Sequence, residues 1–93
     1  MKVTPDIIRY EFIGTDATVA QSNHEGYVGL GGRVIGETKN TFMFLSEGKE
    51  KSVIKESAVF DFKFTDGTIV EIDGKLLVGR SEDRLKKSIK RLW

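Results

Sequence analysis

The sequence contains no cysteine, one histidine, one proline and no long apolar run. The absence of cysteine excludes disulfide scaffolds, thiolate metal sites and cysteine nucleophiles. No apolar segment approaches the roughly 20 residues that cross a bilayer, and charges with Pro5 interrupt the opening MKVTPDIIRYEF before a signal peptide forms. We therefore expect a cytoplasmic protein that does not associate with a membrane.

Groups suited to catalysis or metal binding are also scarce. An enzyme needs nucleophiles, acids, bases or metal ligands that converge in one site. The only histidine, His24, lies in a polar, Gly-flanked stretch that is typical of an exposed loop, and the carboxylates show no recognised metal-ligand spacing. Gly29-x-Gly31-Gly32 precedes a strand pattern, whereas a phosphate loop precedes a helix. We predict no catalytic residue, no metal ligand and no bound cofactor on this chain.

What the sequence does contain is a succession of short β-type runs separated by Gly, Asn and Asp. With 93 residues, 39% of them hydrophobic and 31% charged, it suits one globular domain. No helical crossover separates the runs, which favours a small antiparallel barrel of about six strands, Sm-like or SH3-like. The expected parts are an N-terminal helical segment (1–16), the barrel (17–78) and a basic C-terminal helix (79–93). The expected strands are 17–20, 32–35, 41–45, 51–55, 59–64 and 68–72.

The clearest strand carries Phe60, Phe62 and Phe64 in alternation with charged residues, so these rings should face the core. Asp66-Gly67 follows and predicts a two-residue hairpin with a type I′ turn, in which both residues have positive φ. The alternation and the turn together predict that the strands on either side pair antiparallel.

Both ends carry helix signals. Thr4 precedes Pro5 as an expected N-cap, and Ser81 is the expected N-cap of an amphipathic helix whose apolar stripe begins with Leu85. The segment 79–93 has a net charge of +4, from six basic and two acidic residues, against −3 for the rest of the chain. Such an element suits contact with a polyanion, although a solvated basic helix is the simpler alternative.

Basic residues beside turns are the candidates for binding. Arginine matches phosphate with a planar fork and lysine with a point charge, so a rigid barrel that presents both can hold a folded RNA through its backbone. From composition alone this signal is weak, because charged strand faces are usually just solvated. The candidate RNA contacts are Arg33, Lys39, Asn40, Lys51, Lys55, Arg80, Arg84, Lys87 and Arg91.

Two longer motifs carry a resemblance. The stretches GRVIGETKNT (32–41) and DGKLLVGRSEDR (73–84), with TPDI (4–7), resemble archaeal ribonuclease P protein component 1 over nearly the whole chain. Typical members have proline where this chain has Ser81. The resemblance implies an Sm-like barrel that is a non-catalytic, RNA-binding subunit of a ribonucleoprotein that removes 5′ leaders from precursor tRNA. Cleavage would belong to the RNA, which would need Mg²⁺.

The same resemblance implies partners and surfaces. The partners would be ribonuclease P RNA, the zinc-ribbon subunit called component 4, and other ribonuclease P proteins. It favours Arg33, Lys39 and Arg80 with Arg84 for RNA contact. The expected surface for the protein partner comprises Ile7, Ile8 and Tyr10 with a neighbouring strand. The alternative function is a protein-interaction barrel, either an Sm-like ring, which would elute as an oligomer, or an SH3-like adaptor, which would ignore RNA.

Overall fold

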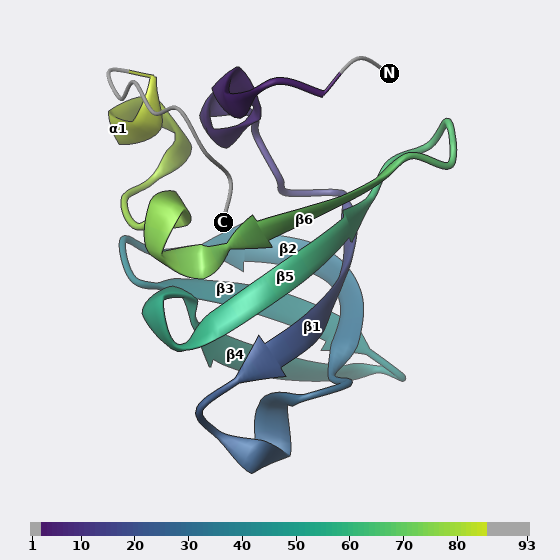
Figure 1. Ribbon diagram of the computed structural model, residues 1–93. Helices are drawn as coiled ribbons and strands as arrows, with labels where there is room; N and C mark the ends of the chain where they lie inside the picture. Colours follow the sequence, from purple (N-terminus) through teal and green to yellow (C-terminus); the bar gives the residue numbers. More distant parts are fainter. Residues whose placement is uncertain (1–2, 86–93) are drawn as a thin grey trace.

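The computed structural model describes residues 3–85, which form six strands and five short helical segments (Figure 1). In chain order the elements are η1 (Pro5–Arg9), β1 (Asp16–Ser22), η2 (Glu25–Tyr27), β2 (Gly31–Glu37), β3 (Thr41–Ser46), β4 (Lys49–Ile54), η3 (Lys55–Ser57), β5 (Ala58–Lys63), β6 (Ile69–Asp73), η4 (Gly74–Leu77) and α1 (Ser81–Arg84), where η marks a 3₁₀ helix. All six expected strands are present at the expected places. None of the described helices is long and apolar enough to cross a membrane.

The strands form one antiparallel sheet in the order β4-β3-β2-β1-β5-β6. The sheet curls so that β1, β5 and β6 lie in front of β2, β3 and β4 in Figure 1. The predicted all-β, antiparallel fold is confirmed. Hydrogen bonds do not close the sheet within the described residues, because β4 and β6 are its two edges. Instead, the turns η3 and η4 pack together beside these edges.

Phenylalanine rings fill the space between the two halves of the sheet. Phe60 and Phe62 are completely buried and Phe64 is 9% exposed, as their alternation predicted. Phe12, which lies between η1 and β1, stacks on Phe62 with 4.3 Å between ring centroids. Burying one such side chain contributes about 1.5–3 kcal/mol, so these rings account for much of the stability of the fold.

The type I′ turn is at a different hairpin from the one predicted. Between β5 and β6 only Gly67 has positive φ, and its N–H donates to the Phe64 carbonyl oxygen at 2.9 Å. The loop is therefore longer than two residues, with glycine in the left-handed position after a tight turn. Glu47 and Gly48 both have positive φ, 51° and 76°, and join β3 to β4 as a two-residue turn.

The two ends of the described chain lie side by side, because α1 packs against η1 (Figure 1). Thr4 is the N-cap residue of η1 and Pro5 its first residue, as predicted. The N-cap of α1 is Arg80, one residue before the predicted Ser81, whose hydroxyl donates to Glu11 Oε2 at 2.9 Å. The rest of the predicted C-terminal helix, 86–93, lies outside the described residues.

Candidate RNA interface

Five of the nine predicted RNA contacts have exposed side chains: Arg33, Lys39, Asn40, Lys51 and Arg80. Lys87 and Arg91 lie outside the described residues. The remaining two, Lys55 and Arg84, are completely buried. Exposure thus divides the predicted contacts into a surface group and an interior group. Hydrogen bonds connect the two groups, since Lys55 Nζ donates to backbone carbonyls of the turns that carry Lys39 and Arg80.

Lys39 and Asn40 occupy the turn between β2 and β3, which residues of the turn itself hold in shape. The Thr38 N–H donates to the Thr41 carbonyl oxygen at 2.9 Å, and the Thr41 N–H donates back to Thr38 Oγ1 at 3.1 Å. These reciprocal bonds fix a short connection with two polar side chains at its tip. The turn therefore presents Lys39 and Asn40 outward.

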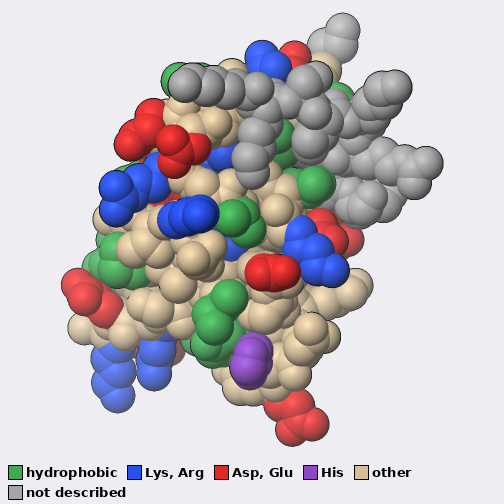
Figure 2. Space-filling model, turned by 90° about the vertical axis from the view of Figure 1, so that its left-hand side faces the viewer, with side chains coloured by type: hydrophobic (Ala, Val, Ile, Leu, Met, Phe, Trp, Pro, Cys, Tyr) green, Lys and Arg blue, Asp and Glu red, His purple; other side chains and the backbone are tan. Residues whose placement is uncertain are grey.

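Arg80 reaches the same place from the other end of the chain. The Gly79 N–H donates to the Lys39 carbonyl oxygen at 2.7 Å, which sets the loop before α1 directly against the turn. Gly79 has a φ of +100°, a backbone conformation that residues other than glycine rarely adopt. We call Thr38–Asn40 together with Gly79–Arg80 the paired turns. Figure 2 shows this side of the molecule, where basic side chains are spread among acidic ones.

Arg33 and Lys51 lie apart from the paired turns. Arg33 is toward the opposite end of β2 and faces Asp16 at 3.9 Å, with both side chains more than half exposed, so the pair contributes little stability. Lys51 lies on the edge strand β4, opposite Phe44 of β3. The structure thus brings Lys39, Asn40 and Arg80 together and leaves Arg33 and Lys51 on separate surfaces.

A buried ion network lies under the paired turns, and it consists of Glu37, Lys55 and Arg84. Glu37 Oε1 accepts from Lys55 Nζ and from Arg84 Nη1, both at 2.8 Å. The Glu37 side chain is 4% exposed and the two cations are fully buried. Burying charges is costly unless they are paired and hydrogen-bonded, so such a cluster needs further acceptors.

Backbone carbonyls supply these acceptors. Lys55 Nζ donates to Thr38 O at 2.9 Å and to Gly79 O at 2.8 Å. Arg84 donates to Ile8 O at 2.7 Å, to Gly79 O at 2.6 Å and to Leu77 O at 3.1 Å. Among the described residues, no buried side-chain nitrogen or oxygen lacks a partner. The carbonyl dipoles thus offset the second positive charge that Glu37 alone does not neutralise.

The network also sets the charge state of its carboxylate. Burial by itself raises the pKa of Glu37, but hydrogen bonds and charges from Arg84 and Lys55 outweigh it, so the pKa lies below the 4.5 of an unperturbed glutamate. Glu37 is therefore ionised at neutral pH, which the two buried cations require.

The prediction that Lys55 and Arg84 contact RNA is therefore wrong, because their donors are directed to Glu37 and to carbonyls in the interior. One signal was available: Lys55 is two residues after Val53, and alternate residues of a strand share a face. Glu37 was missed, since its partners lie 18 and 47 residues further along the chain and no local pattern connects them.

The expected surface for a protein partner also changes. Ile7 and Ile8 are 7% and 1% exposed and belong to the core, so they are not available to a partner. Tyr10 is 45% exposed and packs edge-on against Phe64 at 5.3 Å. It lines an open pocket of about 380 Å³ whose rim includes Arg33 and Lys63.

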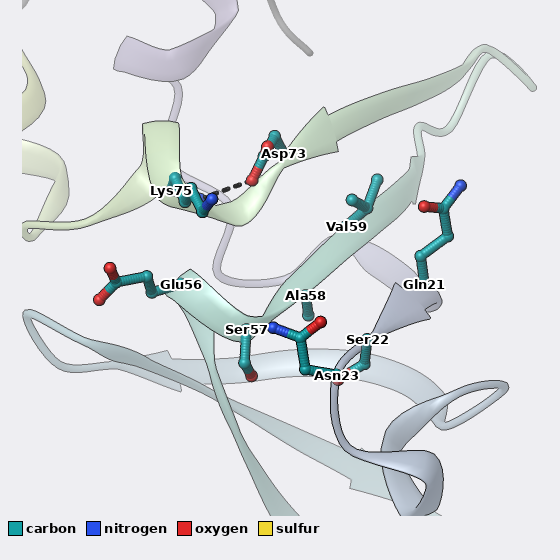
Figure 3. A pocket seen from close by; sticks show the side chains of 9 residues that line it. All are labelled: Gln21, Ser22, Asn23, Glu56, Ser57, Ala58, Val59, Asp73 and Lys75. Carbon is teal, nitrogen blue, oxygen red and sulfur yellow. Dashed lines mark hydrogen bonds between the residues drawn. The ribbon is translucent and has the colours of Figure 1, made fainter.

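A second pocket, of about 210 Å³, lies where β1 ends beside η3 and the start of β5 (Figure 3). Its wall is polar, with Gln21, Asn23 and Ser57 on one side and Asp73, whose carboxylate accepts from the Lys75 N–H at 3.0 Å, on the other. Ser22 and Ser57 line this pocket, but among the described residues no histidine lines it that could act as a general base for either serine. Over residues 3–85 there is no group of three or more His, Asp or Glu side chains that could hold a metal ion.

These features define a small antiparallel β-domain that presents basic turns over a buried ion network. The family model for the ribonuclease P/MRP subunit p29 matches residues 5–87. Ribonuclease P protein component 1 of Methanococcus maripaludis is 44% identical over 98% of both chains. That of Methanothermobacter thermautotrophicus is 43% identical over 96% of this chain and 98% of its own.

A solved structure agrees with the sequence comparisons. This is the structure of Mth11, described as a homologue of the human RNase P protein Rpp29. Its sequence is 43% identical to this chain, and the match has a TM-score of 0.61 and covers 81% of this chain and 97% of Mth11. The chain therefore belongs to the ribonuclease P/MRP subunit p29 family.

Proposed function

We propose that this chain is a non-catalytic, RNA-binding subunit of ribonuclease P that supports the catalytic RNA in removing 5′ leaders from precursor tRNA. Family membership supports the assignment to the complex. The observation that carries the RNA-binding role is the convergence of Lys39, Asn40 and Arg80 on the paired turns. Cleavage and its requirement for Mg²⁺ belong to the RNA in this proposal.

Lysine, arginine and asparagine at adjacent exposed positions suit contact with phosphate and sugar. Arg80 can engage a phosphate with two parallel N–H groups, Lys39 adds a point charge, and the Asn40 amide can donate to a phosphate or accept from a 2′-hydroxyl. Contacts of this kind position a protein on a folded RNA without reading its sequence. Arg33 and Lys51 are proposed as additional contacts on the separate surfaces that they occupy.

We also propose that the protein partner, component 4, contacts the surface around Tyr10. An exposed aromatic ring beside an open pocket with a charged rim is suited to a protein interface. The other ribonuclease P proteins would join through the RNA or through other surfaces of this chain. The alternative function is an adaptor barrel that binds proteins and ignores RNA.

The experiment is a salt-titrated binding measurement with ribonuclease P RNA and an unrelated structured RNA, with and without component 4. We expect Lys39→Ala and Arg80→Ala each to weaken binding and to reduce the slope of log K against log salt by about one unit for each phosphate that the variant no longer binds. Lys49→Ala is the matched control, since Lys49 is an exposed lysine at the distant β3–β4 turn. If neither RNA binds even with component 4 present, the adaptor function replaces this proposal.

A further inference from the structure

We propose that Lys55 is a positioning residue, which sets the two paired turns at the spacing that RNA contact requires without touching RNA itself. This inference rests on the proposed function, because it assumes that Lys39 and Arg80 contact RNA. It assigns Lys55 to the interior support of the interface in place of the direct contact that the sequence predicted.

Lys55 binds every carbonyl group of the β2–β3 turn. Its Nζ donates to Thr38 O at 2.9 Å and to Lys39 O at 3.4 Å, and its backbone N–H donates to Asn40 O at 2.8 Å. One residue therefore fixes three successive peptide groups. The orientation of the Lys39 and Asn40 side chains follows from the position of those peptide groups.

The same ammonium group also binds the second of the paired turns. Lys55 Nζ donates to Gly79 O at 2.8 Å, directly before Arg80. On the other side of the same residue, the Gly79 N–H donates to Lys39 O at 2.7 Å. Gly79 is thus held through both its carbonyl and its amide, so the backbone of Arg80, the next residue, has a fixed position relative to Lys39.

The surroundings of Lys55 restrict its movement. The side chain is completely buried, Nζ lies 4.5 Å from the centre of the Phe42 ring, and Glu37 Oε1 accepts from Nζ at 2.8 Å. A buried ion pair by itself is weak evidence of a stabilising role, since apolar replacements often restore stability. The carbonyl contacts differ, because an apolar side chain cannot hold two turns at a defined distance. Functional side chains lose precision when the groups that support them are removed.

The test is a double-mutant cycle on RNA binding, which combines Lys55→Met with Lys39→Ala and with Arg80→Ala. We expect Lys55→Met alone to weaken binding about tenfold, since the side chains at the paired turns must then be ordered on binding. We also expect Lys39→Ala and Arg80→Ala to cost clearly less in the Lys55→Met background than in the wild type. Native-state hydrogen exchange should show faster exchange of the Gly79 amide in Lys55→Met.

Val53→Ala is the matched control for a role in stability alone. Val53 is fully buried on β4, two residues before Lys55, and its backbone pairs with Phe42 of β3 rather than with either of the paired turns. This variant should lower thermal stability and leave RNA affinity and Gly79 exchange unchanged. If Lys55→Met does not fold, Lys55→Arg takes its place in the cycle, because it keeps the charge beside Glu37 but replaces the compact ammonium with a larger planar fork.

The outcomes separate this inference from the proposed function. If the wild-type protein does not bind RNA, the proposed function fails and the inference fails with it. If the wild type binds, and Lys39→Ala and Arg80→Ala weaken binding, the proposed function stands. In that case the positioning role is overturned if Lys55→Met has no effect on RNA binding, or if its effect is additive with those of both alanine variants. A non-additive cycle with unchanged binding by Val53→Ala supports both.

Discussion

The most informative perturbation of this fold is Arg84→Met, which removes a buried guanidinium and keeps much of its aliphatic bulk. Arg84 connects three parts of the chain, since it donates to Ile8 O of η1 at 2.7 Å, to Gly79 O at 2.6 Å and to Glu37 of β2 at 2.8 Å. Methionine fills the space but donates no hydrogen bond. The segment η1 should lose the hydrogen bond from Arg84 to Ile8 O, and with it the connection that Arg84 makes between η1 and Glu37 of β2.

The magnitude follows from the burial of the network. Removing one partner of a buried ion pair costs about 3–5 kcal/mol. Lys55 still neutralises Glu37 in this variant, so we expect a value near the lower limit, about 3 kcal/mol. A chain of 93 residues typically has a total stability of roughly 5–14 kcal/mol. At about 4–8 °C per kcal/mol, Tm should fall by about 12–24 °C.

The assay is urea and thermal unfolding monitored by circular dichroism, with Arg80→Met as the matched control. Arg80 is an exposed arginine one helical turn before Arg84, and its replacement should change stability by less than about 0.5 kcal/mol. Limited proteolysis should in addition cleave within 5–9 of Arg84→Met before it cleaves the sheet. A destabilisation of less than about 1 kcal/mol, or equal destabilisation of the two variants, would refute the structural role of the network.

Two further predictions concern Glu37 and Gly74. The folded pKa of Glu37 lies below 4.5, so the contribution of its charge to stability is present above about pH 4.5 and is lost as the pH falls toward the folded pKa. Between about pH 5 and pH 3, Glu37→Gln should therefore lose less stability than the wild type in urea titrations. Parallel curves of unfolding free energy against pH for the two proteins would contradict this. Gly74→Ala should cost about 1–3 kcal/mol or more, because a Cβ there would overlap the Lys55 and Ala58 carbonyl oxygens. Gly26→Ala, where a Cβ meets nothing within 4 Å, should be nearly neutral, and equal unfolding midpoints for the two alanine variants would disprove the close approach.

Local patterns in the chain were enough to predict most of the sheet. Alternation placed Phe60, Phe62 and Phe64 in the core, and turn residues separated six strands at their observed places. These signals are local, since a strand repeats every two residues and a turn needs particular φ values. Even so, the type I′ turn could not be assigned to one hairpin, because Asp-Gly and Glu-Gly each permit several loop lengths.

Tertiary contacts decided which charged residues face water and which are buried. Lys39 and Lys55 have the same chemistry in the sequence, yet one lies at the tip of a turn and the other is enclosed beneath it. The difference depends on Glu37, Gly79 and Arg84, which become neighbours only when the sheet curls and α1 packs against η1. A buried charge is tolerated only where partners from distant segments converge on it, and no local sequence pattern records that convergence.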